Sequence, residues 1–211
     1  MWFGQTVGNL GIYFSDVVLV VMMKRVLILG PSGSGKSTVG DRLSRILGIP
    51  VIHLDQHYWK PGWVDTSQDE WRTKVSDLIK SDSWVMDGNY TSTLKLRATA
   101  ADTLIFIDIP RRLSYLRIFT RFLRFRGKTR PDVTEDCPEK IDCDFIRWIW
   151  HYPRTRKPVI LRFLEKQKTT KTVVVLKGQR EVETFLYSLR EQEDVQKRVG
   201  NLSISTPERL L

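Results

Sequence analysis

The chain has 211 residues, 41% of them hydrophobic and 27% charged, which fits one globular domain and excludes disorder as its main state. Two cysteines are too few for a disulfide framework, so we expect a reducing, cytoplasmic setting. The net charge of +10 is concentrated in residues 111–171, which hold 17 Lys or Arg against 7 Asp or Glu. This excess predicts an anionic partner, either the phosphates of a small substrate or a nucleic acid backbone.

Residues 1–22 are apolar, but they lack the features of a signal peptide or a membrane helix. Asp16 interrupts the segment, no Lys or Arg precedes Lys24, and the longest apolar stretch has seven residues. Met22 and Met23 directly precede the first convincing strand. We therefore interpret residues 1–22 as an extension before a natural start at one of these methionines, and we expect no membrane partner. An extra packed segment and a membrane association are the alternatives.

Five short apolar runs predict the strands of a buried sheet, at residues 25–29, 50–54, 83–86, 103–107 and 172–176. Helices are predicted at residues 36–47, after the capping pair Ser67 and Glu70, and at residues 181–190. Because strands and helices alternate, we expect an α/β fold with a parallel sheet and right-handed crossovers. The predicted domain covers residues 23–190, and residues 191–211 form a polar tail.

Residues 30–37 match the phosphate-loop pattern G-x-x-x-x-G-K-[ST] and lie between a predicted strand and a predicted helix, the context that makes the match specific. Backbone N–H groups would surround the phosphates, Lys36 would reach the β- and γ-phosphates, and the Ser37 hydroxyl would bind Mg²⁺. The alternative is a chance glycine-rich turn before a helix. The residues expected to hold ATP and Mg²⁺ here are Gly30, Ser32, Gly33, Ser34, Gly35, Lys36, Ser37 and Thr38.

Three predicted strands end in an aspartate, at Asp55, Asp87 and Asp108. Ligands of open parallel sheets bind beyond the carboxyl ends of the strands, so these acids point to the candidate site. Asp87 is expected to be the second Mg²⁺ anchor, with a turn or helix cap as the alternative. Asp55 is expected to orient or deprotonate an acceptor hydroxyl, with a loop cap as the alternative. Asp108 is expected to be structural.

Aromatic residues are concentrated directly after Asp55, where Tyr58, Trp59 and Trp63 follow one another closely. Such rings can stack on a ring-bearing substrate, and Trp59 is a candidate substrate contact. They can equally cover the edge of the sheet as a small satellite core. The sequence does not choose between these two readings.

Arg117, Arg121 and Arg124 have the i, i+4, i+7 spacing that places side chains on one face of a helix. Arginines of a lid can neutralise the charge that develops on a transferred phosphoryl group, so these three are candidate catalytic residues. The alternative is a solvated basic helix face. A second basic stretch, residues 154–162, follows an aromatic helix predicted at residues 145–152 and could contact single-stranded nucleic acid.

Several strings together resemble the bacterial topology modulation proteins, which are adenylate-kinase-like P-loop proteins. They are GPSGSGKST, HLDQHYWKPGW, WVMDGNY, ADTLIFIDIPRR, RPDVTEDCPEKID and FIRWIWHYPRTR. The resemblance covers roughly residues 23–190. It implies a nucleotide-kinase-like fold with five parallel strands, helices on both faces, and an arginine-rich lid at about residues 117–143.

The resemblance does not supply an acceptor, because the family's name records an association with DNA topology. By analogy with small-molecule kinases of this fold, the acceptor would bind near Asp55 and Trp59. Arg97 falls where such kinases often place a substrate-binding arginine. The turn at residues 178–180 would border the adenine ring, with Arg180 as a nucleotide contact.

We therefore expect a cytoplasmic, Mg²⁺-dependent phosphotransferase that moves the γ-phosphate of ATP to an unidentified small acceptor. One alternative is an ATP-binding protein that interacts with nucleic acid and affects DNA topology, and another is an ATP-binding sensor without turnover. The acceptor, the choice between ATP and GTP, and the oligomeric state stay open.

Overall fold

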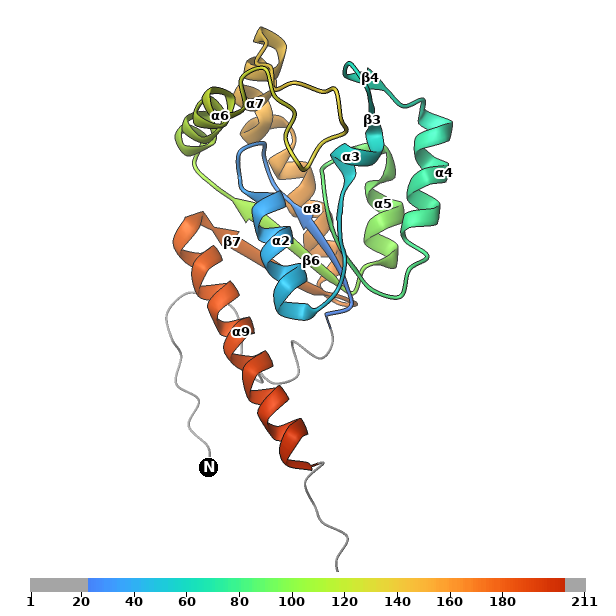
Figure 1. The fold of residues 1–211 in the computed structure, drawn as a ribbon, viewed down its shortest axis with the longest axis vertical. Helices are drawn as coiled ribbons and strands as arrows, with labels where there is room; N and C mark the ends of the chain where they lie inside the picture. The colour runs from blue at the N-terminus through green and yellow to red at the C-terminus, as the bar shows by residue number, and fades with distance from the viewer. Residues whose placement is uncertain (1–22, 204–211) are drawn as a thin grey trace, which may run out of the picture.

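The computed structural model describes residues 23–203 and is built around a five-stranded parallel sheet (Figure 1). The strand order is β2-β5-β1-β6-β7. The strands are β1 (Arg25–Leu29), β2 (Val51–His53), β5 (Trp84–Asp87), β6 (Thr103–Asp108) and β7 (Thr172–Lys177). The predicted parallel sheet is confirmed, and each strand ends within one residue of its expected bounds. The predictions for residues 1–22 and 204–211 lie outside the described residues.

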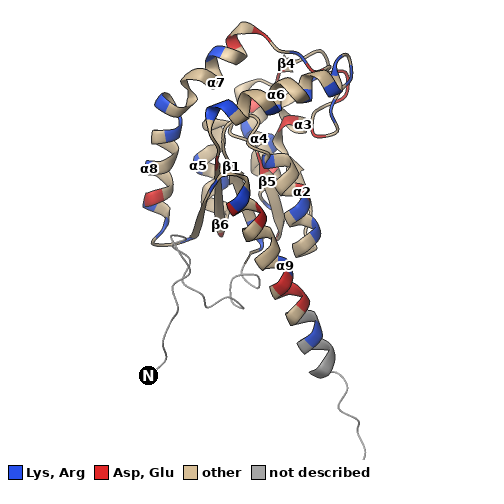
Figure 2. Ribbon diagram, turned by 90° about the vertical axis from the view of Figure 1, so that its left-hand side faces the viewer, with Lys and Arg blue, Asp and Glu red and all other residues tan. Residues whose placement is uncertain are grey.

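Helices cover both faces of the sheet, as predicted. One face is covered by α2 (Lys36–Leu47) and α9 (Gly178–Ser203). The other face is covered by α4 (Gln68–Leu78), α5 (Thr91–Ala100) and α8 (Lys157–Gln167). Helix α9 continues past residue 190 because residues 191–198 are mostly good helix formers without Gly or Pro. Its C-terminal half extends beyond the sheet, as Figures 1 and 2 both show.

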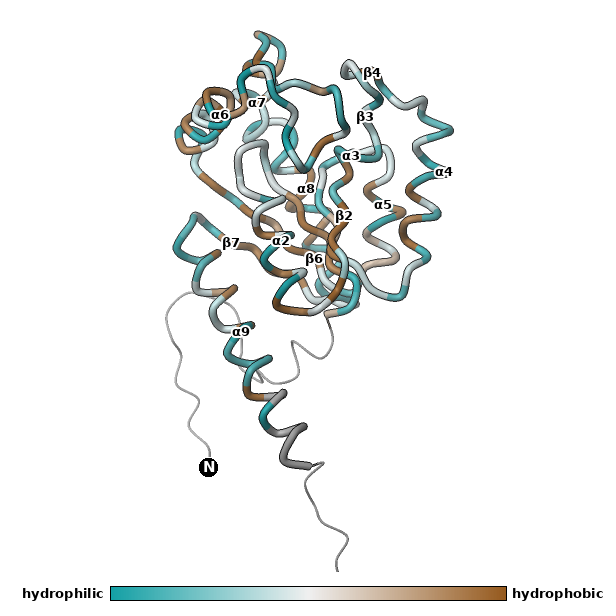
Figure 3. The backbone as a smooth tube through the Cα atoms, viewed as in Figure 1, coloured by the Kyte–Doolittle hydropathy of each residue, from teal (hydrophilic) through white to brown (hydrophobic). Residues whose placement is uncertain are grey.

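The central strand β1 shows how the sequence pattern produces the two layers. Val26 and Ile28 enter the core beneath α2 and α9, whereas Leu27 and Leu29 enter the core on the opposite face. Successive side chains of a strand point to opposite faces, so a strand that is covered on both sides is apolar throughout. Figure 3 shows these hydrophobic strands at the centre of the fold, between more polar helices.

Three further helices and a short hairpin lie around the carboxyl edge of the sheet. They are α3 (Leu54–Tyr58), the hairpin β3 (Trp59–Lys60) with β4 (Val64–Asp65), α6 (Arg111–Phe125) and α7 (Cys143–Thr155). Residues 126–142, here called the lid segment, connect α6 to α7 and pass close to α3 and the hairpin (Figure 1). No helix within residues 23–203 is long and apolar enough to span a membrane.

Candidate active site

Residues 30–35 form a tight turn between β1 and α2. Gly30 has a φ of +154°, and a Cβ at this position would lie 2.5 Å from the carbonyl oxygen of Ile107. Gly33 has a φ of +74°, and a Cβ there would lie 2.8 Å from the carbonyl oxygen of Ser114. Only glycine fits these positions, so the backbone can curl tightly before α2 begins at Lys36.

The start of α2 is suited to an anion. Its N-cap residue is Gly35, so no side chain caps the first N–H groups of the helix, and the first turn contains no acidic residue. The first N–H groups of the helix therefore keep their partial positive charge for a ligand. The other predicted loop residues, Ser32, Ser34 and Thr38, lie in or beside this turn, and Ser34 is buried.

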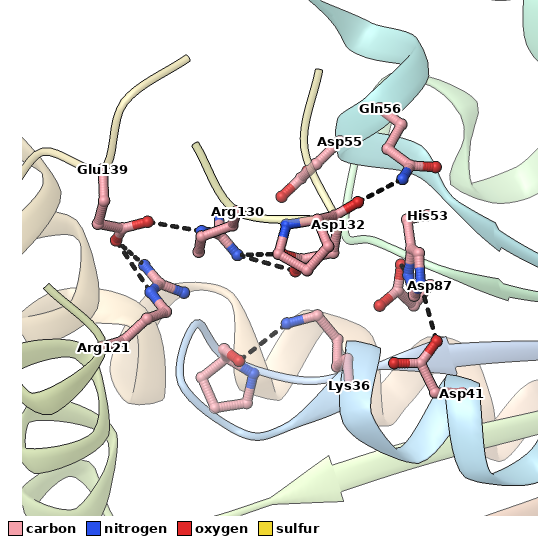
Figure 4. A network of polar contacts seen from close by, with 12 residues as sticks. Lys36, Asp41, His53, Asp55, Gln56, Asp87, Arg121, Arg130, Asp132 and Glu139 are labelled. Atoms are coloured by element: carbon pink, nitrogen blue, oxygen red, sulfur yellow. Dashed lines mark hydrogen bonds and ion pairs between the residues drawn. The ribbon is translucent and has the colours of Figure 1, made fainter. Parts of the chain in front are cut away.

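Lys36 projects into the space between the phosphate loop and the carboxylates of Asp55 and Asp87 (Figure 4). Its Nζ donates a hydrogen bond to the carbonyl oxygen of Pro31 at 3.0 Å. Burial lowers the pKa of Lys36, while the charges of Asp87 and Asp55 oppose that change. The ammonium group thus faces the place where a phosphate held by the loop would meet Asp55.

Asp87 ends β5 beside the phosphate loop and is only 4% exposed. Its Oδ1 lies 3.2 Å from Nδ1 of His53, whose Nε2 lies 3.2 Å from Oδ1 of Asp41. Burial alone would lower the pKa of His53, but the hydrogen bond and charge of Asp87, together with Asp41, raise it to about 9. His53 is therefore a buried imidazolium between two carboxylates, a role that the apolar pattern of its strand does not indicate.

The second oxygen of Asp87 suits a magnesium ion. Oδ2 is buried and has no hydrogen-bond partner among the described residues, which is unusual for a carboxylate oxygen. Ser37 is the second residue of α2 and so lies in its first turn. A hydroxyl and one carboxylate oxygen fit Mg²⁺, which takes its other ligands from phosphates and water. Within residues 23–203, no cluster of three or more His, Cys, Asp or Glu could hold a metal by protein ligands alone.

Asp55 lies one residue beyond the expected strand end, in the first turn of α3, because that helix begins at Leu54. Its Oδ1 accepts a hydrogen bond of 2.6 Å from the hydroxyl of Tyr90. Burial raises the pKa of Asp55, the Tyr90 hydrogen bond lowers it, and the charge of Asp87 raises it again. Figure 4 shows that Asp55 faces Lys36 across the space above the phosphate loop.

Arg97 lies beneath the loop of residues 88–90 rather than in an open acceptor site. It is 0% exposed, and its guanidinium donates hydrogen bonds to the carbonyl oxygens of Gly88 at 3.0 Å and of Tyr90 at 2.8 Å. The intervening residue, Asn89, accepts a hydrogen bond from the N–H of Gly30 and donates one to its carbonyl oxygen. All of these contacts hold the backbone of the site, and none leaves Arg97 open to a small acceptor.

The three predicted lid arginines separate in space. Arg117 donates to the carbonyl oxygen of Ser34 at 3.2 Å and to Oε1 of Gln179 at 2.6 Å, so it joins the phosphate loop to the start of α9. Arg121 lies over the loop, where its charge acts on Lys36. Arg124 is exposed and stacks on Phe125, 5.3 Å from the ring centroid, because α6 leads away from the loop at this point.

A buried ion-pair network ties the lid to the site (Figure 4). Glu139 accepts a hydrogen bond from Nε of Arg121 at 2.9 Å and forms ion pairs with both Arg121 and Arg130. Nη1 of Arg130 also donates to both carboxylate oxygens of Asp132, at 2.9 and 2.8 Å. The charge of Arg130 acts on both Lys36 and Asp55, so Arg130 belongs to the site although its spacing from the other arginines did not single it out.

The aromatic stretch after Asp55 supports the lid. The Thr134 hydroxyl lies 2.7 Å from the carbonyl oxygen of Trp59, and Nε1 of Trp63 donates to the carbonyl oxygen of Pro138 at 2.9 Å. The rings of Trp59 and Trp63 pack edge to face, with centroids 5.2 Å apart. Tyr58 packs inward against the buried ring of Trp71.

The expected turn before α9 lies next to the phosphate loop through Gln179, whereas the neighbouring Arg180 is exposed. Asp108, expected to be structural, forms an ion pair of 2.7 Å with Lys157.

The phosphate-loop motif, its glycine-dependent turn and the sheet order define a P-loop α/β fold with a five-stranded parallel sheet. No family model matches the chain. It is 31% identical over 100 residues to the uncharacterized protein YqaC of Bacillus subtilis (strain 168), an alignment that covers 46% of this chain and 56% of that protein. The predicted membership of the topology modulation family therefore stays a prediction.

The chain is also 27% identical over 124 residues to an adenylate kinase of Thermotoga maritima, which covers 57% of this chain and 56% of the enzyme. The chain thus spans little more than half the length of these relatives. Among solved structures, a gluconokinase from Sinorhizobium meliloti 1021 aligns over 88% of this chain and 99% of its own, with 15% identity and a TM-score of 0.46. A shikimate kinase from Aquifex aeolicus aligns over 86% and 99%, with 18% identity and a TM-score of 0.42.

Proposed function

We propose that this protein is a Mg²⁺-dependent kinase that transfers the γ-phosphate of ATP to a hydroxyl group of a small acceptor. One observation carries the proposal: Lys36 at the phosphate loop and the carboxylate of Asp55 face one another beneath Arg121 of α6 and Arg130 of the lid segment (Figure 4). This is the arrangement that in-line transfer between a nucleotide and an acceptor needs.

The nucleotide end of the site is formed by residues 30–38. Backbone N–H groups would bind the phosphates, and Lys36 would exchange its contact with Pro31 for the β- and γ-phosphates. Ser37 and Oδ2 of Asp87 are the groups that would hold Mg²⁺, which when bound supplies charge neutralisation on the phosphates. The nucleoside would lie next to Arg117, Gln179 and Arg180.

Asp55 would orient the acceptor hydroxyl and take up its proton as the bond to phosphorus forms. Burial raises the pKa of this carboxyl, and a carboxylate with greater proton affinity is a better general base. Trp59 lies four residues further on and would border the acceptor from the hairpin. Cytoplasmic location and the bounds of the domain, residues 23–190, stay part of this proposal.

Arg117, Arg121 and Arg130 would stabilise the charge on the transferred group. Arg121 and Arg130 are paired with Glu139 and Asp132, so phosphoryl oxygens would compete with these carboxylates for the same N–H donors. We omit Arg124 from the mechanism because its side chain is exposed and makes no contact with the phosphate loop in the described residues.

The test measures Mg²⁺-dependent release of ADP from ATP in the presence of single acceptors: nucleoside monophosphates, nucleosides and small hydroxy acids. The wild-type chain is compared with Lys36→Ala and Asp55→Asn, and with Lys95→Ala as a matched control on the exposed side of α5. Stimulation by one acceptor that both site variants lose, and the control keeps, supports a kinase. Acceptor-dependent turnover that Asp55→Asn leaves unchanged would remove Asp55 from the mechanism.

Nucleic-acid binding is a second candidate function, favoured by the surface of α7. Trp150 is 50% exposed, and the guanidinium of Arg111 lies 4.0 Å from the centroid of its ring. Lys and Arg recur along α7 and α8 (Figure 2). An exposed indole beside arginines suits a stacked base and a phosphate. Fluorescence anisotropy of a labelled single strand at low and physiological salt tests this candidate: absent binding at low salt, or Trp150→Ala binding as wild type, rejects it.

A further inference from the structure

Residues 88–90 touch both halves of the candidate site. Asn89 binds Gly30 through both atoms of its side-chain amide, at 2.7 Å to the carbonyl oxygen and 3.3 Å from the N–H. The next residue, Tyr90, donates to Asp55. One short loop therefore connects the start of the phosphate loop to the carboxylate proposed to bind the acceptor.

Asp55 depends on this loop for its orientation. Its own helix, α3, has only five residues, and the side-chain contact of Asp55 within the described chain is the hydrogen bond of 2.6 Å from Tyr90. A carboxylate on a short helix would otherwise rotate about its side-chain bonds. The hydrogen bond selects one orientation and leaves Oδ2 for another ligand.

The hydroxyl of Tyr90 is itself held firmly. Its ring packs against Tyr58, with centroids 4.5 Å apart, and against Trp71 at 4.9 Å. Its backbone carbonyl accepts a hydrogen bond of 2.8 Å from Arg97. Burial and the charges of Asp55 and Asp87 raise the pKa of Tyr90, so the hydroxyl stays protonated and donates. Tyr90 thus has both a fixed position and a fixed hydrogen-bonding role.

Arg97 stabilises the backbone of the loop. Its guanidinium is fully buried and binds the carbonyl oxygens of residues 88–90 and the hydroxyl of Thr93, and no carboxylate within residues 23–203 forms an ion pair with it. Burying a charge without a counter-ion costs free energy, which these hydrogen bonds offset only while the carbonyls keep their positions. A Cβ on Gly88 would lie 2.9 Å from Cβ of Leu54, so the loop also packs closely against the start of α3.

We propose that Tyr90 is a positioning residue for the transfer reaction: held by Arg97 and linked to the phosphate loop through Asn89, it fixes the carboxylate of Asp55 relative to the nucleotide. The inference rests on the proposed function, since it assigns Asp55 the acceptor hydroxyl. Residues 88–90 would thereby connect the nucleotide end of the site to the acceptor end. The spacing of the acids in the sequence did not indicate this connection.

Tyr90→Phe tests the inference because it keeps the packed ring and removes only the hydrogen-bond donor. We expect kcat to fall about 10- to 100-fold, as for loss of a hydrogen bond to a charged group, while KM for ATP stays near the wild-type value. The control is Tyr58→Phe, which removes a hydroxyl from the same aromatic cluster but not from Asp55. A fall in kcat that is equal in both variants would overturn the proposal.

A pH profile separates positioning from a general loss of stability. The charged and titratable groups that act on Asp55 are Tyr90, Asp87, Arg130 and Lys36. The Tyr90 hydrogen bond lowers the pKa of Asp55, so its removal should move the acid limb of kcat/KM to higher pH. The limb should stay in place in Tyr58→Phe. An unchanged limb in Tyr90→Phe refutes the role of Tyr90 even if kcat falls.

Two further measurements complete the test. In an Asp55→Asn background, Tyr90→Phe should cause little additional loss of turnover, because a positioning residue acts through its partner; fully additive losses would contradict the proposal. NMR titration of the Asp55 carboxyl carbon, in the wild type and in Tyr90→Phe, needs no acceptor and should show a higher pKa in the variant. If no acceptor stimulates ADP release, the proposed function fails, whereas an unchanged carboxyl pKa sinks the inference about Tyr90.

Discussion

Replacing His53 by glutamine tests the charge state around the candidate metal carboxylate. His53 is 8% exposed and lies between Asp87 and Asp41, which raise its pKa to about 9. Because the pKa in the folded state exceeds the ordinary value of 6.5, the folded protein holds this proton more tightly than the unfolded chain. The resulting stabilisation is fully present below pH 6.5 and is lost as the pH rises through about 9.

The size of the effect follows from the two pKa values. The interval between 6.5 and about 9 corresponds to about 3 kcal/mol, because each pH unit is equivalent to about 1.4 kcal/mol. The Asp41 side chain is 43% exposed, and screening by water on that side reduces the expected value to about 2 kcal/mol. Glutamine can donate a hydrogen bond to Asp87 but carries no charge. His53→Gln should therefore lose about 2 kcal/mol of unfolding free energy near pH 6 and much less near pH 9.5.

The assay is equilibrium unfolding in urea, followed by the fluorescence of the buried Trp71 and Trp84 at several values between about pH 6 and about pH 9.5. The control is His151→Gln, which changes an exposed histidine of α7 and should give the wild-type pH dependence. A difference between wild type and His53→Gln that stays constant across this range would show that His53 has the same pKa in the folded and unfolded states, and would refute the reasoning.

Three further changes test other parts of the site. Gly33→Ala places a Cβ 2.8 Å from the carbonyl oxygen of Ser114, so binding of a fluorescent ATP analogue should be lost, whereas Gly48→Ala, with no atom within 4 Å, should bind as wild type. In Asp87→Asn, the Mg²⁺ concentration needed for half-maximal nucleotide binding should rise about 10-fold, measured by calorimetry over a range of Mg²⁺ concentrations. An unchanged concentration removes Asp87 as a ligand. Thr134→Val removes the hydroxyl that contacts the carbonyl oxygens of Gln56 and Trp59, so hydrogen exchange in the lid segment should rise by about 10-fold. Exchange at the wild-type rate would mean that these contacts do not hold the lid.

Elements that depend on neighbouring residues were predictable. The phosphate loop is encoded by consecutive residues, since its shape requires backbone freedom at Gly30 and Gly33 and a helix that starts at Lys36. The strands were predictable because a sheet covered on both faces needs uninterrupted apolar runs. The start of α4 was predictable for the same local reason: the N–H of Glu70 donates to the hydroxyl of Ser67 at 3.4 Å.

Helix α5 shows where local pattern fails. Its buried face combines Leu94 and Ala98 with Arg97, and a buried arginine interrupts the apolar periodicity by which a helix is recognised. The guanidinium is tolerated there only because the loop of residues 88–90 presents carbonyl oxygens to it. Arg97 was expected to contact the acceptor, but in the structure it supports the loop of residues 88–90. The tertiary contacts that cause this difference cannot be predicted from residue spacing.

The sheet, the phosphate loop and the acids near the strand ends could be predicted from the sequence, because each depends on residues that are close together in the chain. Which charges meet depends on how the elements pack together. Spacing places Arg121 and Arg124 on one helix face, but the direction of α6 brings Arg121 to Glu139 and leaves Arg124 exposed. His53 meets Asp87 across 34 residues and Asp55 meets Tyr90 across 35. Such pairs form because the strand order brings the carboxyl ends of β2 and β5 together, and sequence periodicity carries no information about that order.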